Sequence, residues 1–151
     1  MTWERGRAVV EQLLAESRLE MTSGAAADAA PWLASAAALL ESARREIENN
    51  PEAAFVLAYD AARKACTALL AQQGLRTKGT SHHVTVERVV RAQFAGPFDA
   101  FGALRRRRNE IEYPQRPGEA LDPGEAPDAI TQADAIVTAA TRLVPQLTPF
   151  H

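Results

Sequence analysis

The sequence has one cysteine, Cys66, few aromatic residues and almost no runs of β-branched residues. A single cysteine excludes an intrachain disulfide and fits a reducing compartment, and the shortage of β-branched runs argues against a sheet. No apolar run is long enough to cross a bilayer. The N-terminus carries Glu4 and lacks the basic and then apolar layout of a signal peptide. We therefore expect a cytoplasmic protein without membrane contact.

An excess of charge of one sign is also missing, because 17 basic residues face 19 acidic ones and the formal net charge is −2. The surface as a whole does not favour nucleic acid, so any attraction to phosphate must be local. The strongest candidate is the arginine run Arg105 to Arg108. No metal or other cofactor is expected, since the cysteine lies within a predicted helix and His151 is terminal.

Apolar residues make up 46 % of the 151 residues, alanine is abundant, and glycine and proline gather between periodic segments. This composition predicts a single all-α domain over residues 1–151, arranged as an up-and-down bundle of five or six helices. An N-terminal helix and linker would occupy 1–24, the bundle 31–147, and an exposed proline-rich loop 114–127. The helices are predicted at 2–20, 31–49, 52–73, 82–94, 98–113 and 128–147, and 75–80 is predicted to be a polar loop.

The stretch from Phe98 to Pro114 organises the chain. At about 100° per residue, its apolar residues Phe98, Phe101, Leu104 and Ile111 share one broad arc. The consecutive arginines must then spread around the helix. Arg106 and Arg107 point away from the arc and are predicted to meet water, while Arg105 sits at its edge, near Glu112 and Tyr113.

Arg108 falls inside the apolar arc. An unpaired buried charge costs several kcal/mol, so this guanidinium needs a compensating group. Two readings remain open: an internal ion pair with Glu112 or with an acid on another helix, and a role facing phosphate or RNA. The two are compatible, because an acid can orient an arginine that also meets a ligand.

Two segments, AFVLAYDAARKACTALLAQQGLRTKGTSHH (54–83) and LRRRRNEIEYP (104–114), together resemble the HEPN domain family. The first matches an alanine-rich helix with Tyr59, then Gly74, then a histidine-containing loop. The second matches the site helix, where the family has an arginine, usually a polar residue such as asparagine after it, and a histidine four to six residues further on. The resemblance covers roughly residues 35–147.

Arg108-Asn109 stands where the family's arginine and asparagine stand, and Tyr113 stands in the place of its histidine. A shorter variant of the family motif has a tyrosine two residues beyond the histidine. If Tyr113 is aligned with that tyrosine, Ile111 stands at the histidine position and Arg106 at the arginine position. Tyrosine has a pKa near 10 and is a poor base at neutral pH. Histidine would then have to come from His82 or His83, which the sequence does not place near Arg108.

The resemblance implies a homodimer that binds RNA or a nucleotide, with metal-independent ribonuclease activity in the active members of the family. It implies a toxin–antitoxin or phage-defence setting, with an antitoxin or effector protein as a further partner. The alternative is a non-catalytic dimerisation or interaction module of the same fold. The expected site comprises Arg108, Asn109 and Tyr113 as catalytic residues, Arg105, Arg106, His82 and His83 as RNA- or phosphate-binding residues, and Glu112 as the partner of Arg108.

Overall fold

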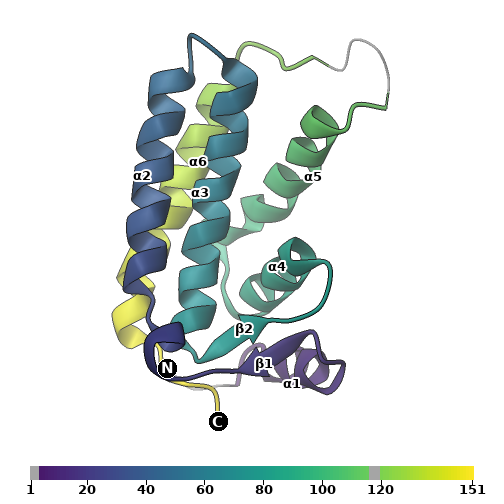
Figure 1. Cartoon of the computed structure of the whole chain (residues 1–151), viewed down its shortest axis with the longest axis vertical. Coiled ribbons are helices and arrows are strands. Elements are labelled where there is room, and N and C mark those ends of the chain that lie inside the picture. The colour runs from purple at the N-terminus through teal and green to yellow at the C-terminus, as the bar shows by residue number, and fades with distance from the viewer. Residues whose placement is uncertain (1–3, 116–119) are drawn as a thin grey trace.

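The computed structural model describes residues 4–115 and 120–151. Three long helices, α2 (Ala30–Glu46), α3 (Pro51–Gln72) and α6 (Glu125–Leu143), form the tall part of the molecule. Helix α3 lies at the centre, against α2 and α6 on one side and α4 (His82–Gln93) and α5 (Phe101–Glu112) on the other (Figure 1). The predicted all-α bundle is thus confirmed. No helix within these two ranges is long and apolar enough to span a membrane.

Helix α3 can occupy the centre because many of its own side chains are small. Small residues let neighbouring helices approach closely. Most alanines of α3 are fully buried, namely Ala54, Ala58, Ala61, Ala62, Ala65 and Ala68. The start of α3 is well defined, since Asn50 Oδ1 accepts a hydrogen bond of 3.2 Å from the Ala53 amide and Pro51 occupies the first helical position.

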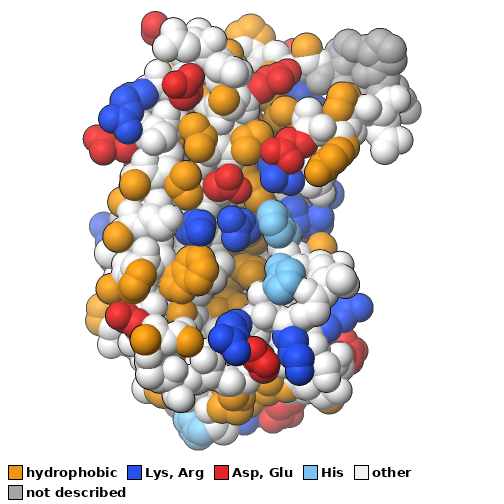
Figure 2. Space-filling view, viewed as in Figure 1, with side chains coloured by type: hydrophobic (Ala, Val, Ile, Leu, Met, Phe, Trp, Pro, Cys, Tyr) orange, Lys and Arg blue, Asp and Glu red, His pale blue; other side chains and the backbone are white. Residues whose placement is uncertain are grey.

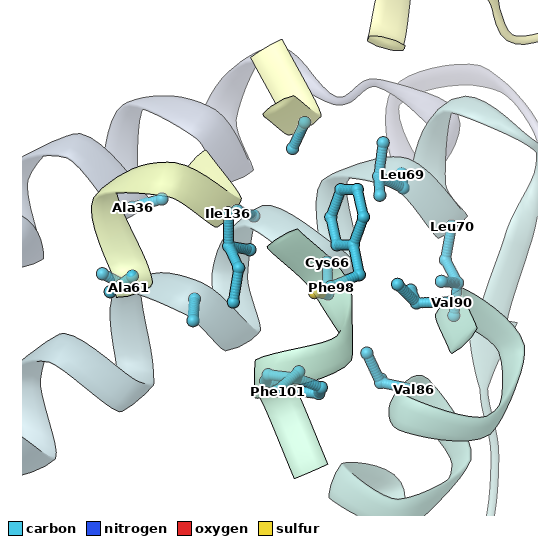
Figure 3. Packing of buried hydrophobic residues seen from close by; sticks show 14 of the residues in the cluster. Ala36, Ala61, Cys66, Leu69, Leu70, Val86, Val90, Phe98, Phe101 and Ile136 are labelled. Carbon is cyan, nitrogen blue, oxygen red and sulfur yellow. The ribbon is translucent and has the colours of Figure 1, made fainter. Parts of the chain in front are cut away.

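The core continues across both sides of α3. Ile136 of α6 and Ala36 of α2 meet Ala61 on one side, whereas Phe98 and Phe101 pack beside α4 on the other (Figure 3). Phe98 belongs to a 3₁₀ turn, η2 (Gly96–Ala100), that leads directly into α5. The predicted helix over 98–113 is therefore a 3₁₀ turn followed by an α-helix, and its buried aromatic residues fix the end of α5 from which the arginines extend.

The N-terminal prediction is corrected by the structure. Helix α1 covers only Arg7–Ala15, and Ser17 ends it with a left-handed φ of 58°. A short strand β1 (Leu19–Met21) then pairs antiparallel with β2 (Leu75–Thr77), inside the segment predicted to be a polar loop. This pairing joins residues far apart in the sequence, so a local pattern could not reveal it. Trp3, placed on the first predicted helix, lies outside the described residues.

The proline-rich loop is shorter than predicted, because α6 begins at Glu125. Glu125 accepts a hydrogen bond of 2.8 Å from the Asp122 amide, and an acid in a first turn suits the helix dipole. The described parts of the predicted loop are mostly exposed, as expected, and residues 116–119 of it lie outside the described residues. At the other end, a 3₁₀ turn, η3 (Val144–Gln146), follows α6 at Pro145.

Candidate functional site

A pocket of about 530 Å³ opens between α3, α4 and α5. Figure 2 shows basic and histidine side chains gathered around a hollow on this face. None of the described residues that line it carries a carboxylate. We call it the basic pocket, defined by Arg63, Arg105, Arg108, His82, His83 and Asn109, with Ser81 and Val84 at the start of α4.

Arg108 is turned inward, as predicted. Its side chain is 20 % exposed and forms an ion pair of 2.9 Å with Glu112, one turn further along α5. Its guanidinium carbon lies 5.8 Å from the centroid of the Tyr59 ring, and its buried Nε has no hydrogen-bond partner among the described residues. Arg108 therefore forms the expected ion pair with Glu112 and also lines the basic pocket, while its role toward phosphate or RNA stays a prediction.

Arg105 differs from the prediction in its neighbours. Its Nε donates to Glu87 of α4 across 2.7 Å, rather than lying beside Glu112 and Tyr113. Glu87 is a buried carboxylate that also lies 3.4 Å from Arg91. The sequence analysis did not identify Glu87 as a buried partner, because it is a single charged residue in a half-buried helix. Its position next to Val86 and one turn before Val90, both on the apolar face, was the signal that it could be buried.

Arg107 corrects a second expectation, since it does not simply face water. It donates to Glu125 of α6 over 2.7 Å and 3.0 Å and to Glu110 over 3.0 Å. The bonds to Glu125 tie α5 to the start of α6 and lower the pKa of Glu125. Arg106 is exposed, as predicted from the arc, and does not line the basic pocket, so its assignment to phosphate binding there is not supported by its position.

His83 comes close to Arg108 only through the tertiary structure. Its Nδ1 lies 2.7 Å from the Tyr59 hydroxyl, and the two rings are stacked with centroids 5.6 Å apart. Tyr59 is fully buried in the core, and its ring also stacks on the ring of Phe101. Tyr59 thus holds the imidazole of His83 in a set orientation beside the Arg108 guanidinium.

The start of α4 forms another wall of the basic pocket. His82 is exposed, and its Nδ1 lies 2.7 Å from Thr77 Oγ1 of β2. Ser81 occupies the N-cap position predicted for it, but in a left-handed conformation (φ 60°, ψ 39°) and without a side-chain cap. Such a conformation is costly for a non-glycine residue and is found preferentially at ligand sites.

Arg63 is the pocket residue that the sequence analysis missed. It follows Tyr59 by four residues on α3, and this i, i+4 spacing was the signal that both share one face. Its Nε is buried without a hydrogen-bond partner among the described residues, and it lies 3.9 Å from Asp60. It adds a third cation to the pocket from a helix other than the one carrying the arginine run.

Tyr113 is not brought to the pocket. It is the C-cap of α5, with φ −128° and ψ 66°, and is 68 % exposed. The chain leaves the helical path here because Pro114 follows. Tyr113 thus lies one turn beyond Asn109 and outside the lining of the basic pocket. Asn109 lines the pocket and is exposed, and its side chain forms no hydrogen bond with the described residues.

The electrostatics of the pocket keep His83 neutral. Burial, helped by the nearby cations of Arg63 and Arg108, lowers the pKa of His83 below its ordinary 6.5. Burial also raises the pKa of the Tyr59 hydroxyl, which therefore stays protonated. At neutral pH the pocket holds an uncharged imidazole among fixed guanidinium groups, which is a combination suited to proton transfer next to an anion.

A pH titration followed by NMR should give His83 a midpoint below 6.5. The unfolded chain binds this proton more readily than the folded protein does, so protonation of His83 favours unfolding. The free energy of unfolding therefore keeps its full contribution from His83 above pH 6.5 and decreases as the pH drops through the folded-state pKa. Arg63→Ala removes one of the cations that lower this pKa and should move the midpoint upward. A His83→Gln spectrum identifies the resonance, and an unshifted midpoint would contradict the pocket geometry.

Among the described residues, no three His, Cys, Asp or Glu side chains gather in a way that could hold a metal ion. The arrangement instead offers arginines for phosphate oxygens and an imidazole for proton transfer. Comparisons of the chain with protein-family models, curated proteins and solved structures give no match.

Proposed function

We propose that this protein is a HEPN-like protein that binds the phosphate groups of RNA or a nucleotide in the basic pocket. The observation that carries the proposal is the convergence of Arg63, Arg105 and Arg108 on one pocket without a carboxylate in its lining. Guanidinium groups bind phosphate oxygens well because their planar fork of donors matches the oxygen geometry. The toxin or phage-defence setting rests on the family resemblance alone.

We propose further that the pocket cleaves RNA without a metal. In this reaction the 2′-oxygen attacks the adjacent phosphorus, the bond from phosphorus to the 5′-oxygen breaks, and a cyclic phosphate remains. Neutral His83 accepts the 2′-hydroxyl proton, and a proton is delivered to the departing 5′-oxygen from His82 or water. Arg108 stabilises the charge that develops on the phosphorane oxygens. His83 thereby takes the part of the family's histidine, which the resemblance aligns with Tyr113.

A second candidate is a non-catalytic module that pairs with a second copy or with an antitoxin or effector protein. It is favoured by the pairing of every pocket arginine with an acid, since Arg105, Arg108 and Arg63 lie beside Glu87, Glu112 and Asp60. Arginines already neutralised in this way can serve the fold alone. Binding and cleavage assays separate the two candidates.

Binding is tested by fluorescence anisotropy with a labelled 2′-O-methyl oligonucleotide, which cannot be cut at its 2′-oxygen. We expect Arg108→Ala to weaken binding by about 10- to 100-fold, because it removes charge-assisted hydrogen bonds to phosphate. Binding should also weaken as salt rises. Arg45→Ala is the matched control, because it removes the same charge from an exposed position on α2. Equal loss in both variants would contradict a specific site.

Cleavage is tested with unmodified RNA in the presence of EDTA. The parent protein should produce ends with a cyclic 2′,3′-phosphate, and both His83→Ala and Arg108→Ala should lose the activity. Equal cutting by all three proteins would show that the ribonuclease activity comes from a contaminant, and the enzyme proposal would be wrong. Tight, salt-sensitive binding without cleavage would limit the function to RNA or nucleotide binding. Neither binding nor cleavage, together with stable self-association, would favour the interaction module.

A further inference from the structure

A second pocket of about 450 Å³ lies near the C-terminal half of α3, where α2 begins and β2 passes. Its walls are mainly apolar, with Trp32, Leu70 and Leu75 among them. Trp32 is only partly buried, so its indole ring is accessible from the pocket. We call this the apolar pocket. A partly exposed tryptophan in a concave apolar site is a surface on which a flat ring can stack.

The apolar pocket adjoins the basic pocket. Thr77 lines the apolar pocket and His82 lines the basic pocket, and their side chains are in hydrogen-bond contact at 2.7 Å. Along α3, Arg63 lines the basic pocket and Thr67 the apolar one, with Thr67 Oγ1 donating to the Arg63 carbonyl over 2.9 Å. Four residues of helix span about 6 Å. On α3, the facing edges of the two pockets are therefore about one helical turn apart, which is comparable to the length of one nucleotide.

Charge determines which part of a ligand each pocket suits. The Asp28 carboxylate and the Arg76 guanidinium both line the apolar pocket, and Arg76 is already paired with Glu20 of β1. Among the described residues, the lining of this pocket therefore offers no unpaired cation to a phosphate. The Lys64 ammonium lies 4.8 Å from the centroid of the Trp32 ring, and Arg63 precedes it on α3, so cations flank the path between the pockets. The basic pocket therefore suits phosphate, and the apolar pocket suits an uncharged ring whose polar edge can meet Asp28, Thr67 or Thr77.

We propose that the two pockets form one groove for single-stranded RNA, in which a nucleobase stacks on Trp32 while a neighbouring phosphate occupies the basic pocket. This inference rests on the proposed function and adds a base-binding site to it. Stacking on an aromatic ring tolerates any base, so the groove would select single strands rather than a sequence. A duplex would not enter, because its bases are already stacked on one another and paired.

The first test uses the fluorescence of Trp32 in a Trp3→Phe background, since the chain has two tryptophans. The probes are a 2′-O-methyl oligouridylate and an abasic oligomer with the same backbone and length. We expect the oligouridylate to quench Trp32 and the abasic oligomer to bind without quenching. Equal quenching by both oligomers, or none by the oligouridylate while it binds, would overturn the base-stacking site.

The second test compares affinities for the same two probes. Trp32→Leu should weaken oligouridylate binding about tenfold or more and leave abasic binding unchanged, whereas Trp32→Phe should restore most of the affinity. Arg108→Ala should weaken both probes alike. Unchanged oligouridylate affinity in a folded Trp32→Leu protein overturns this inference alone. Failure of the parent protein to bind either oligomer overturns the proposed function and this inference with it.

Discussion

Replacing Phe98 by alanine should lower the free energy of unfolding by about 3–5 kcal/mol. The Phe98 ring is almost completely buried, lies 5.6 Å from the Phe94 ring, and packs among Cys66 and Leu69 of α3 and Val90 of α4 (Figure 3). Alanine would leave a cavity at the point where η2 leads into α5. The loss combines the transfer free energy of the ring with the cost of that cavity. Urea unfolding measures it directly.

Tyr113→Ala is the matched control for this prediction, because it removes an aromatic ring at the opposite end of α5. Tyr113 is 68 % exposed, so its loss should change stability by less than about 0.5 kcal/mol. A Phe98→Ala protein as stable as the Tyr113→Ala protein would mean that the α5 side of the core is not packed as described. For a chain of this size, the loss expected for Phe98→Ala corresponds to a fall in melting temperature on the order of 10 °C.

Glu87→Ala should destabilise the protein by roughly 3 kcal/mol. The Glu87 side chain is 9 % exposed and the Arg105 side chain 18 % exposed, and the two are joined across 2.7 Å between α4 and α5. Removing the carboxylate leaves the Arg105 guanidinium partly buried without its acid. Gly102 of α5 faces the same carboxylate, since a Cβ there would overlap Glu87 Oε1. A side chain at this position would displace the Glu87 carboxylate from its place beside Arg105.

A double-mutant cycle separates the ion pair from the other effects of the substitution. Glu87→Ala combined with Arg105→Ala should cost less than the sum of the single changes, because the double variant leaves neither charge without its partner. Glu110→Ala provides a matched comparison, since Glu110 is mostly exposed beside Arg107 and its removal should change stability by less than about 1 kcal/mol. Additive effects of Glu87 and Arg105 would show that the two side chains do not interact.

The sequence by itself determined the features that depend on neighbours along the chain. Helical periodicity is local, so the helices at Pro51–Gln72 and His82–Gln93 were predicted to within a residue or two. The inward position of Arg108 and its pairing with Glu112 also follow from spacing within one helix. The exposed position of Arg106 has the same origin.

Only the tertiary structure decided which helices share the pocket. His83 reaches Arg108 through Tyr59, Arg105 finds Glu87, and Arg107 finds Glu125, and each of these contacts joins different helices. The β1–β2 pairing is likewise between distant segments. Side-chain periodicity says which face of a helix is buried, but not which other helix covers it or in what register. That choice depends on the packing of the whole core, and it placed the imidazole of His83, and not the phenol of Tyr113, in the lining of the basic pocket.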